Sequence, residues 1–259
     1  MIGRSLVRLG ARSVSVIESL GRLTAFGGLA VQATPRAMLR FRRLVDEVFA
    51  TGVMSLSIIT VSGAAVGMVL GLNGYHTLIR YGAEENLGAI VAITLIRELG
   101  PVLTALLLAG RAGSAAAGEI GSMVATEQID GLRMMAIDPL DFVVWPKLAA
   151  FLIATPLLAA LFIAFGLCGG YVAGVTILGV DAGSYVAGIE ASITFAEEIA
   201  MCLVKAISFG GLVGLIATYH GYTAEPHVAG VSRATTASVV AASVCVLLSD
   251  YVITALWEA

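Results

Sequence analysis

The chain has 259 residues, of which 58% are hydrophobic and only 13% are charged. Soluble domains carry about 25% charged residues, so this composition excludes soluble enzyme folds and predicts a polytopic membrane protein. The formal net charge of −3 decides little, because the distribution of the charges matters more than their sum.

Residues 1–47 form a basic segment in which apolar residues are interleaved. Its first 43 residues hold eight arginines and a single acid, Glu18. This segment is too charged to span a membrane, so we expect one or two amphipathic helices on the membrane surface, broken near Pro35. Arginine-rich segments remain on the cytoplasmic side, which predicts a cytoplasmic N-terminus.

Five apolar stretches follow, and each is long enough to cross a membrane. The third contains Pro156 and is longer than one span needs, so counts of four or six depend on how it is divided; we favour five. The predicted fold is an all-α membrane protein, with an interfacial segment at 1–47 and a five-span domain at 48–259. The expected spans lie near residues 48–72, 87–110, 147–178, 197–219 and 236–257.

Glycines recur at four-residue spacing in three of these stretches. Small residues at this spacing let helix backbones approach closely, so tight packing within the bundle is the simpler interpretation. The alternative is a sliding or dimerising interface. The glycines are Gly63, Gly67 and Gly71, then Gly166, Gly170 and Gly174, then Gly210 and Gly214.

Ionisable residues occur inside three of the apolar stretches, where a charge costs roughly 2.5–3.5 kcal/mol or more. Glu98, with Arg97 beside it, lies in the second stretch, Lys205 in the fourth and Asp250 in the fifth. At about 1.5 Å per residue, the two acids and Lys205 share one depth and can neutralise one another. Arg97 points about 100° away from Glu98 and needs another partner.

Three interpretations of this cluster remain open. It can lock the bundle, line a polar path for an amphipathic substrate, or relay protons.

The loop at residues 111–140 is predicted to lie in the cytoplasm and to form a helix over about 123–137. Ile129, Leu132 and Met135 recur at three-residue steps, and the charged residues Glu127, Asp130 and Arg133 lie on the other side. Exposed Met and Leu side chains suit a groove on a partner protein. The alternative is a surface helix that packs only on its own bundle.

The sequence shows no motif for catalysis, nucleotide binding or metal binding. It contains no GxxxxGK[ST] motif, no plausible Ser/His/Asp or Cys/His set, and no metal-ligand spacing among its histidines and cysteines. We therefore expect no catalytic residues, no metal and no cofactor in this chain; if ATP drives its function, ATP and Mg²⁺ bind to another subunit. Nothing predicts nucleic-acid binding.

Four runs resemble the MlaE permease family, the membrane subunits of bacterial MCE-type ABC systems that move phospholipids. They are VSGAAVGMVLGLNGY at 61–75, LIRELGPVLTALLLAGRAGSA at 95–115, EIGSMVATEQIDGLRMMAIDPL at 119–140 and GVSRATTASVV at 230–240. The number and order of spans agree, so the resemblance covers about residues 48–257.

The resemblance implies a homodimeric permease in the bacterial inner membrane. It implies a coupling helix, at about 123–137, that docks on the ATPase MlaF, with the STAS-domain protein MlaB attached to that ATPase. A periplasmic MlaD hexamer is expected above the permease. Leu70 and Tyr81 match positions that line the family's lipid pocket at the dimer interface, and Arg97, Glu98, Lys205 and Asp250 match its charged positions.

The predicted function is therefore the permease subunit of an ATP-driven transporter that moves phospholipids between the inner membrane and periplasmic carriers and so maintains outer-membrane asymmetry. The alternative is a proton-coupled carrier that uses Glu98, Lys205 and Asp250 as a relay. A membrane-embedded lipid enzyme is disfavoured, because no nucleophile or metal set is present.

Overall fold

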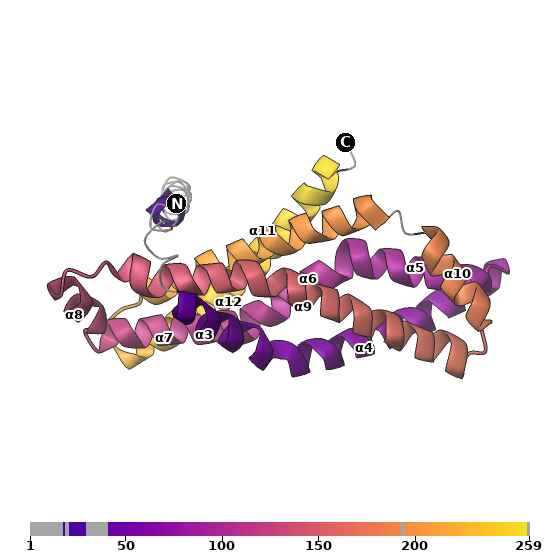
Figure 1. Cartoon of the computed structure of the whole chain (residues 1–259), viewed down its shortest axis with the longest axis horizontal. Coiled ribbons are helices and arrows are strands. Elements are labelled where there is room, and N and C mark those ends of the chain that lie inside the picture. The colour runs from indigo at the N-terminus through magenta and orange to yellow at the C-terminus, as the bar shows by residue number, and fades with distance from the viewer. Residues whose placement is uncertain (1–17, 19–20, 30–40, 193–194, 258–259) are drawn as a thin grey trace, which may run out of the picture.

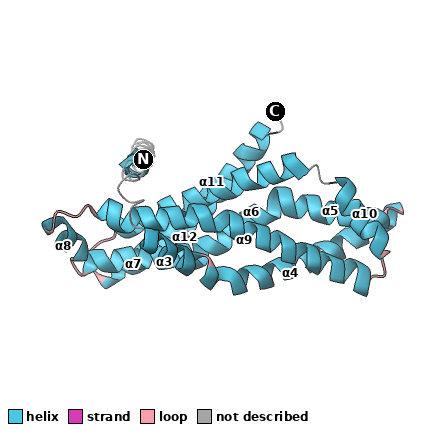
Figure 2. Cartoon of the chain, in the orientation of Figure 1, coloured by secondary structure: helices cyan, strands magenta, loops and turns pink. Residues whose placement is uncertain are grey.

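The chain folds into an elongated bundle of helices (Figure 1). The computed structural model describes residue 18 and residues 21–29, 41–192 and 195–257; the predicted break near Pro35 lies outside this part. Within the described residues there is no strand (Figure 2). In this part of the chain, five stretches are long and apolar enough to cross a membrane, which confirms the predicted all-α fold and span number. They are Arg42–Tyr81, Glu84–Ala125, Leu140–Ile177, Glu197–Tyr222 and Val228–Trp257.

Most spans consist of several consecutive elements, in which short 3₁₀ or π turns (η) interrupt α-helices. In chain order these are α3 (Phe41–Thr51), η2 (Val53–Ser55), α4 (Leu56–Leu78), η3 (Ile79–Tyr81), η4 (Glu84–Asn86), α5 (Leu87–Thr94), η5 (Leu95–Leu99), α6 (Gly100–Leu108), η6 (Ala109–Gly113), α7 (Ser114–Ala125), α8 (Gln128–Met134), η7 (Leu140–Val144), α9 (Trp145–Tyr171), η8 (Val172–Ile177), α10 (Ala182–Ser192), α11 (Phe195–Tyr222) and α12 (Val228–Trp257).

The long third stretch is one span. α9 continues without interruption through Pro156, so the alternative counts of four or six spans are wrong. The predicted boundary between residues 47 and 48 falls inside α3, which runs directly into the first span.

Two glycine faces pack against each other at the contact between α4 and α9. A Cβ atom at Gly63 would lie 2.6 Å from the carbonyl oxygen of Phe162, and one at Gly67 would lie closer still to the carbonyl oxygen of Gly166. Real Cβ atoms do not approach that closely, so the absence of side chains permits this contact. Tight packing within the bundle is therefore the correct interpretation of this glycine face, and its use as a dimer interface is wrong.

The two ends of the bundle carry different connections (Figure 1). α8 lies at one end, where Arg133 donates a hydrogen bond to the Tyr222 hydroxyl at 2.8 Å. Residues 21–29 approach the same end of α11, because Phe26 packs against Tyr219 and Tyr222 with ring centroids 5.6 Å apart. The predicted topology requires this arrangement, because it places the N-terminal segment and the 111–146 loop on the same side of the membrane.

The opposite end contains α10, although we expected residues 179–196 to be a loop. The carboxylate of Asp181 accepts a hydrogen bond from the Ser184 backbone N–H at 2.8 Å and one from its hydroxyl. These bonds cap the helix and lower the pKa of Asp181. The backbone of Tyr185 lies against Gly88 of α5, and its buried ring packs against Gly170 of α9 and Gly174 of η8; burial raises the pKa of Tyr185 to about 12. α10 is thus a packed part of the bundle.

Candidate functional site: an ion-pair network at membrane depth

The predicted cluster forms around Lys205, whose side chain is completely buried. Its ammonium lies 2.9 Å from Glu98 Oε2 and 2.8 Å from Asp250 Oδ1. The contact with Glu98 is also a hydrogen bond, whereas the contact with Asp250 is an ion pair. The structure therefore brings together the three residues that were predicted from depth alone, on three different spans.

Lys205 also contacts the backbone carbonyl that lies four residues before Pro101. Lys205 Nζ donates to the carbonyl oxygen of Arg97 at 2.9 Å. In a regular α-helix that oxygen would accept from the N–H of residue 101, but proline has no N–H and its ring crowds the carbonyl four residues earlier. The chain widens there into the π turn η5. Such turns are frequent at functional sites, and this one sets both Arg97 and Glu98 against α11.

Arg97 binds Glu198, a residue that the sequence analysis missed. Arg97 Nε donates to Glu198 Oε2 at 2.6 Å, and a terminal nitrogen donates to Oε1 at 2.5 Å. Glu198 retains 6% exposure of its side chain, whereas Arg97 retains 40%. The spacing holds a signal that could have found it, because Glu198 precedes Lys205 by seven residues and so shares its face of α11.

The network combines two cations with three carboxylates, and its exposure is graded. Glu98 is 40% exposed and Asp250 is 20% exposed, in contrast to Lys205. Thr254 also donates a long hydrogen bond of 3.4 Å to Glu98 Oε1. Glu98 and Arg97 therefore present the open edge of the network, where a polar group could exchange with them, and Lys205 is its fixed centre.

Leu70 and Tyr81 lie apart from this network. Leu70 lines a cavity of about 230 Å³ between α4 and α5, together with Thr77 and Thr94. Tyr81 ends η3 and is 80% exposed. One copy of the chain thus does not join these two residues and the charged groups into a single pocket.

The predicted helix at 123–137 is two elements. α7 ends at Ala125, Glu127 has a left-handed backbone with φ of 58°, and α8 begins at Gln128. Ile129 and Leu132 pack on Ile120 inside the chain, so they are not the exposed groups that we expected.

Met135 is exposed as predicted, at 63%, and Met134 beside it is 85% exposed. Arg133 remains on the surface, paired with Asp130 at 2.9 Å.

Fold and site together define a polytopic membrane protein that holds a network of charges among its spans. The chain belongs to the MlaE permease family, since the family model described as Permease MlaE matches residues 44–256. No three His, Cys, Asp or Glu side chains among the described residues gather in a way that could hold a metal ion.

Similar proteins cover nearly the whole chain. The intermembrane phospholipid transport system permease protein MlaE of Haemophilus influenzae is 45% identical over 258 residues, which are 99% of this chain and 98% of that protein. A probable ABC transporter permease protein of Rickettsia bellii is 35% identical over 96% of each chain. The chloroplastic protein TRIGALACTOSYLDIACYLGLYCEROL 1 of Arabidopsis thaliana is 27% identical over 87% of this chain and 64% of its own length.

Proposed function

We propose that this chain is the permease subunit of an ATP-driven transporter that moves phospholipids between the bacterial inner membrane and periplasmic carriers, and so maintains the lipid asymmetry of the outer membrane. The observation that carries the proposal is the 45% identity to the Haemophilus protein along 99% of the chain. The chain itself performs no covalent step. It lies in the inner membrane with its N-terminus in the cytoplasm.

The graded exposure of the charged network supports a lipid path. A phospholipid carries a charged headgroup and two apolar chains, so its path needs polar groups at membrane depth that remain neutralised when no lipid is present. Lys205 with Glu98 and Asp250, and Arg97 with Glu198, meet that need. Leu70 and Tyr81 complete the lipid contacts when two copies associate.

A proton relay is less well supported by the same geometry. The ammonium of Lys205 has three acceptors around it, two carboxylates and the carbonyl of Arg97. These contacts hold the buried side chain in one place from three sides, and so favour a fixed position over a relay.

ATP hydrolysis takes place in a cytoplasmic partner, the ATPase MlaF, to which the STAS-domain protein MlaB is attached. The ATPase docks at α8, where Met134 and Met135 are exposed beside the charged residues Glu127 and Arg133. Flexible Met side chains suit a protein groove. Ile129 and Leu132 contribute indirectly, because they fix α8 on the bundle. A hexamer of MlaD receives or supplies lipid on the periplasmic side.

The test is purification of the native complex, with identification of bound lipid and co-purifying subunits by mass spectrometry, followed by lipid transfer in proteoliposomes. We expect phospholipid, an ATPase and an MCE protein to co-purify, and transfer to require ATP. Transfer that survives removal of the ATPase and collapses with the proton gradient would establish the carrier function instead.

A further inference from the structure

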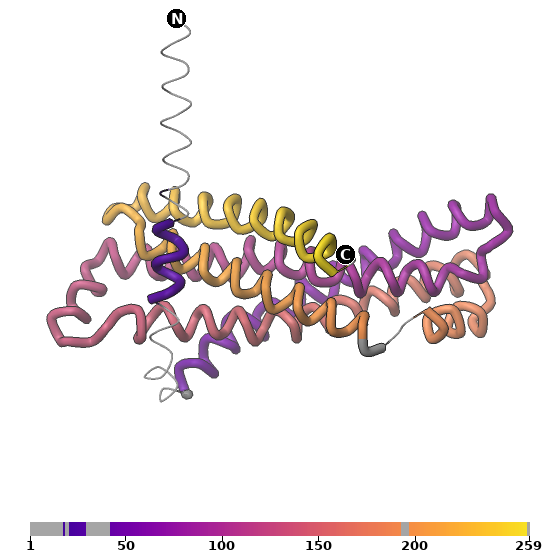
Figure 3. The backbone as a smooth tube through the Cα atoms, turned by 90° about the horizontal axis from the view of Figure 1, so that it is seen from above, coloured from indigo at the N-terminus to yellow at the C-terminus, as the bar shows by residue number. Residues whose placement is uncertain are grey.

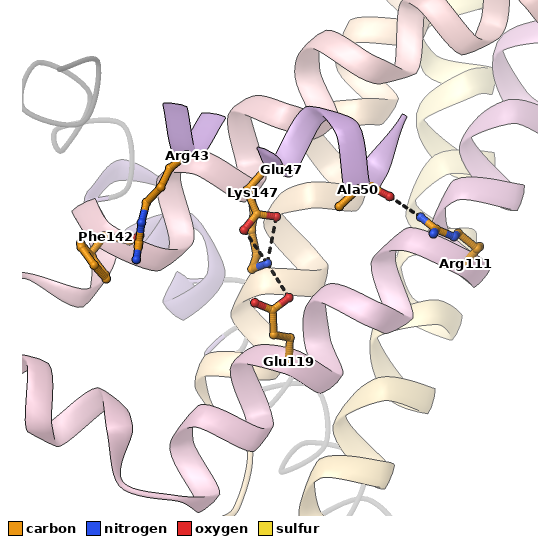
Figure 4. A network of polar contacts seen from close by, with 7 residues as sticks. All are labelled: Arg43, Glu47, Ala50, Arg111, Glu119, Phe142 and Lys147. Carbon is orange, nitrogen blue, oxygen red and sulfur yellow. Dashed lines mark hydrogen bonds and ion pairs between the residues drawn. The ribbon is translucent and has the colours of Figure 1, made fainter. Parts of the chain in front are cut away.

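A second buried cation, Lys147, lies at the α8 end of the bundle and joins three elements. Its side chain is 5% exposed. The ammonium, near the start of α9, contacts both carboxylate oxygens of Glu47 on α3 at 2.9 and 3.0 Å, and Glu119 Oε2 on α7 at 2.7 Å (Figure 4). One charge therefore connects α3, which leads into the first span, with α7 at the end of the second span and α9 in the third.

α3 is anchored along one face by further contacts on either side of Glu47. At its beginning, Arg43 donates to the carbonyl oxygen of Phe142 at 2.8 Å, and its guanidinium lies 3.4 Å from the centre of the Phe142 ring. At the end of α3, Arg111 donates to the carbonyl oxygen of Ala50 at 2.5 Å. Residues 43, 47 and 50 share one helix face.

The two carboxylates of Lys147 are not equivalent. Glu47 is 26% exposed and offers two oxygens, whereas Glu119 is 60% exposed and offers one. If Glu119 leaves, Lys147 keeps a carboxylate, so no buried charge is left unpaired. If Glu47 leaves, the buried ammonium depends on the more exposed partner. Release of α7 is therefore the less costly of the two changes.

The surroundings allow such a release. A cavity of about 260 Å³ lies beside the ammonium, lined by Glu119, Met123 and Asp46 among others, and gives the Glu119 side chain room to turn away. The π turn η6 precedes α7 in the second span and contains Arg111, whose side chain donates to the last turn of α3. π turns interrupt regular helix hydrogen bonding, so α7 can pivot there while Arg111 keeps its contact.

We propose that Lys147 is a positioning residue that joins α9 to α3 permanently and to α7 reversibly, and so passes movement of α7 and α8 to the first span. α8 follows α7 after only Thr126 and Glu127, and α3 continues through η2 into α4. The inference rests on the proposed docking of the ATPase at α8. In each transport cycle, the contact between Lys147 and Glu119 breaks and re-forms, and the contact with Glu47 persists.

The first test measures thermal unfolding of the purified full chain, without partners, for Glu47→Gln, Glu119→Gln and Glu190→Gln. Glu190 is an exposed carboxylate on α10 at the opposite end and serves as the control. We expect Glu47→Gln to lower the unfolding midpoint by about 5 °C or more, and the other two to remain within about 2 °C of the parent. An equal or larger loss in Glu119→Gln would overturn the proposal.

The second test measures lipid transferred per ATP hydrolysed in the reconstituted complex. Glu119→Gln should keep the ATPase bound and hydrolysing, but lower this ratio about fivefold or more, while Glu190→Gln leaves it unchanged. An unchanged ratio in Glu119→Gln would overturn the coupling role. Failure of the parent chain to bind any ATPase would overturn the proposed function and the coupling role with it; the unfolding experiment would still rank the two carboxylates.

Discussion

Lys205 can hold a full charge among apolar spans because each contact around it comes from a different source. Glu98 and Asp250 supply charge, and Arg97 supplies a backbone carbonyl. The second span thus contributes both a carboxylate and a carbonyl to the environment of a lysine in the fourth. The RELGP string at 97–101 places the carboxylate, the carbonyl and the proline within one turn of chain.

We predict that Lys205→Ala and Glu98→Ala reduce lipid transfer more than they reduce the yield of assembled complex. Loss of Lys205 leaves the carboxylates of Glu98 and Asp250 at membrane depth without the cation that they share. Val204→Ala, on a lipid-exposed face of the same helix, is the matched control. Complex yield, thermal unfolding and lipid transfer are measured for all variants.

The double variant, Lys205→Ala with Glu98→Ala, tests whether the two residues act together or independently. Because Lys205 and Glu98 are in contact, their effects should depart from additivity by about 0.5–3 kcal/mol. Strictly additive effects would deny the coupling, and normal transfer in all variants would dismiss a functional role. A fall of assembly in parallel with transfer would mean that the network only locks the bundle.

A second prediction compares two adjacent acids at the start of α11. Glu198→Gln removes the charge that Arg97 contacts through two hydrogen bonds, whereas Glu197→Gln changes an exposed carboxylate beside it. Hydrogen bonds to charged groups contribute about 1.5–3 kcal/mol each, and the 40% exposure of Arg97 lowers this figure. We expect Glu198→Gln to lower the unfolding midpoint and lipid transfer, and Glu197→Gln to change neither. Equal effects would contradict the assignment.

At the scale of single residues, the sequence was sufficient to select the charged residues inside apolar stretches, but not those at the ends of such stretches. Glu98, Lys205 and Asp250 stand out because a lone charge in lipid needs a partner. Glu198 and Lys147 lie near the ends of spans, where charged residues are normally solvated, so composition gave no reason to select them. Only the packing of other elements over these positions buries them.

Between the second and third spans, the apolar spacing was identified correctly, but the surface that it exposes was predicted wrongly, because the backbone does not form one continuous helix. Three-residue steps of Ile129, Leu132 and Met135 suggested one apolar face on one helix. The left-handed residue Glu127 redirects the chain before α8, so Ile129 and Leu132 turn inward. Glutamate rarely adopts that conformation, and no glycine or proline marked the position.

The coupling prediction therefore keeps Met135, adds Met134, and no longer includes Ile129 and Leu132 as docking groups. Met134→Asp with Met135→Asp should abolish co-purification of the ATPase without lowering the unfolding midpoint, because both side chains already face solvent. Leu132→Asp should lower the midpoint, since it places a charge in a packed cluster. Val228→Asp, an exposed apolar residue at the start of α12, is the control. Undiminished ATPase binding in the double variant would rule out docking at α8.

At the scale of the whole molecule, the glycine spacing could be identified but not assigned to a partner. Four-residue glycine repeats predict close backbone approach, and Gly63 and Gly67 do approach α9. The same repeat would serve contacts within one chain or between two. The choice depends on which helix faces the repeat, and that is a property of the assembled bundle.

The spans also differ in how much of their surface the single chain covers. In α12 only 11% of the apolar window is buried, compared with 50% in the α11 span. α12 lies along one edge of the bundle, beside α11 (Figure 3). Its uncovered face and the exposed side of α4 are the surfaces left for a second copy, since the glycine side of α4 is already occupied by α9.

The last prediction tests the proposed homodimer on these surfaces. With the three native cysteines replaced by alanine, single cysteines at Val61, Met68 or Val244 should form crosslinked dimers in the membrane, because these positions lie on the exposed sides of α4 and α12. Exposed apolar residues are normal in lipid, so Leu157→Cys, on the exposed side of α9, is the necessary control and should remain uncrosslinked. Gly67→Cys is unsuitable, since its side chain would collide with α9. Crosslinking at Leu157 alone would place the interface on α9, and a strictly monomeric chain with intact lipid transfer would exclude the homodimer.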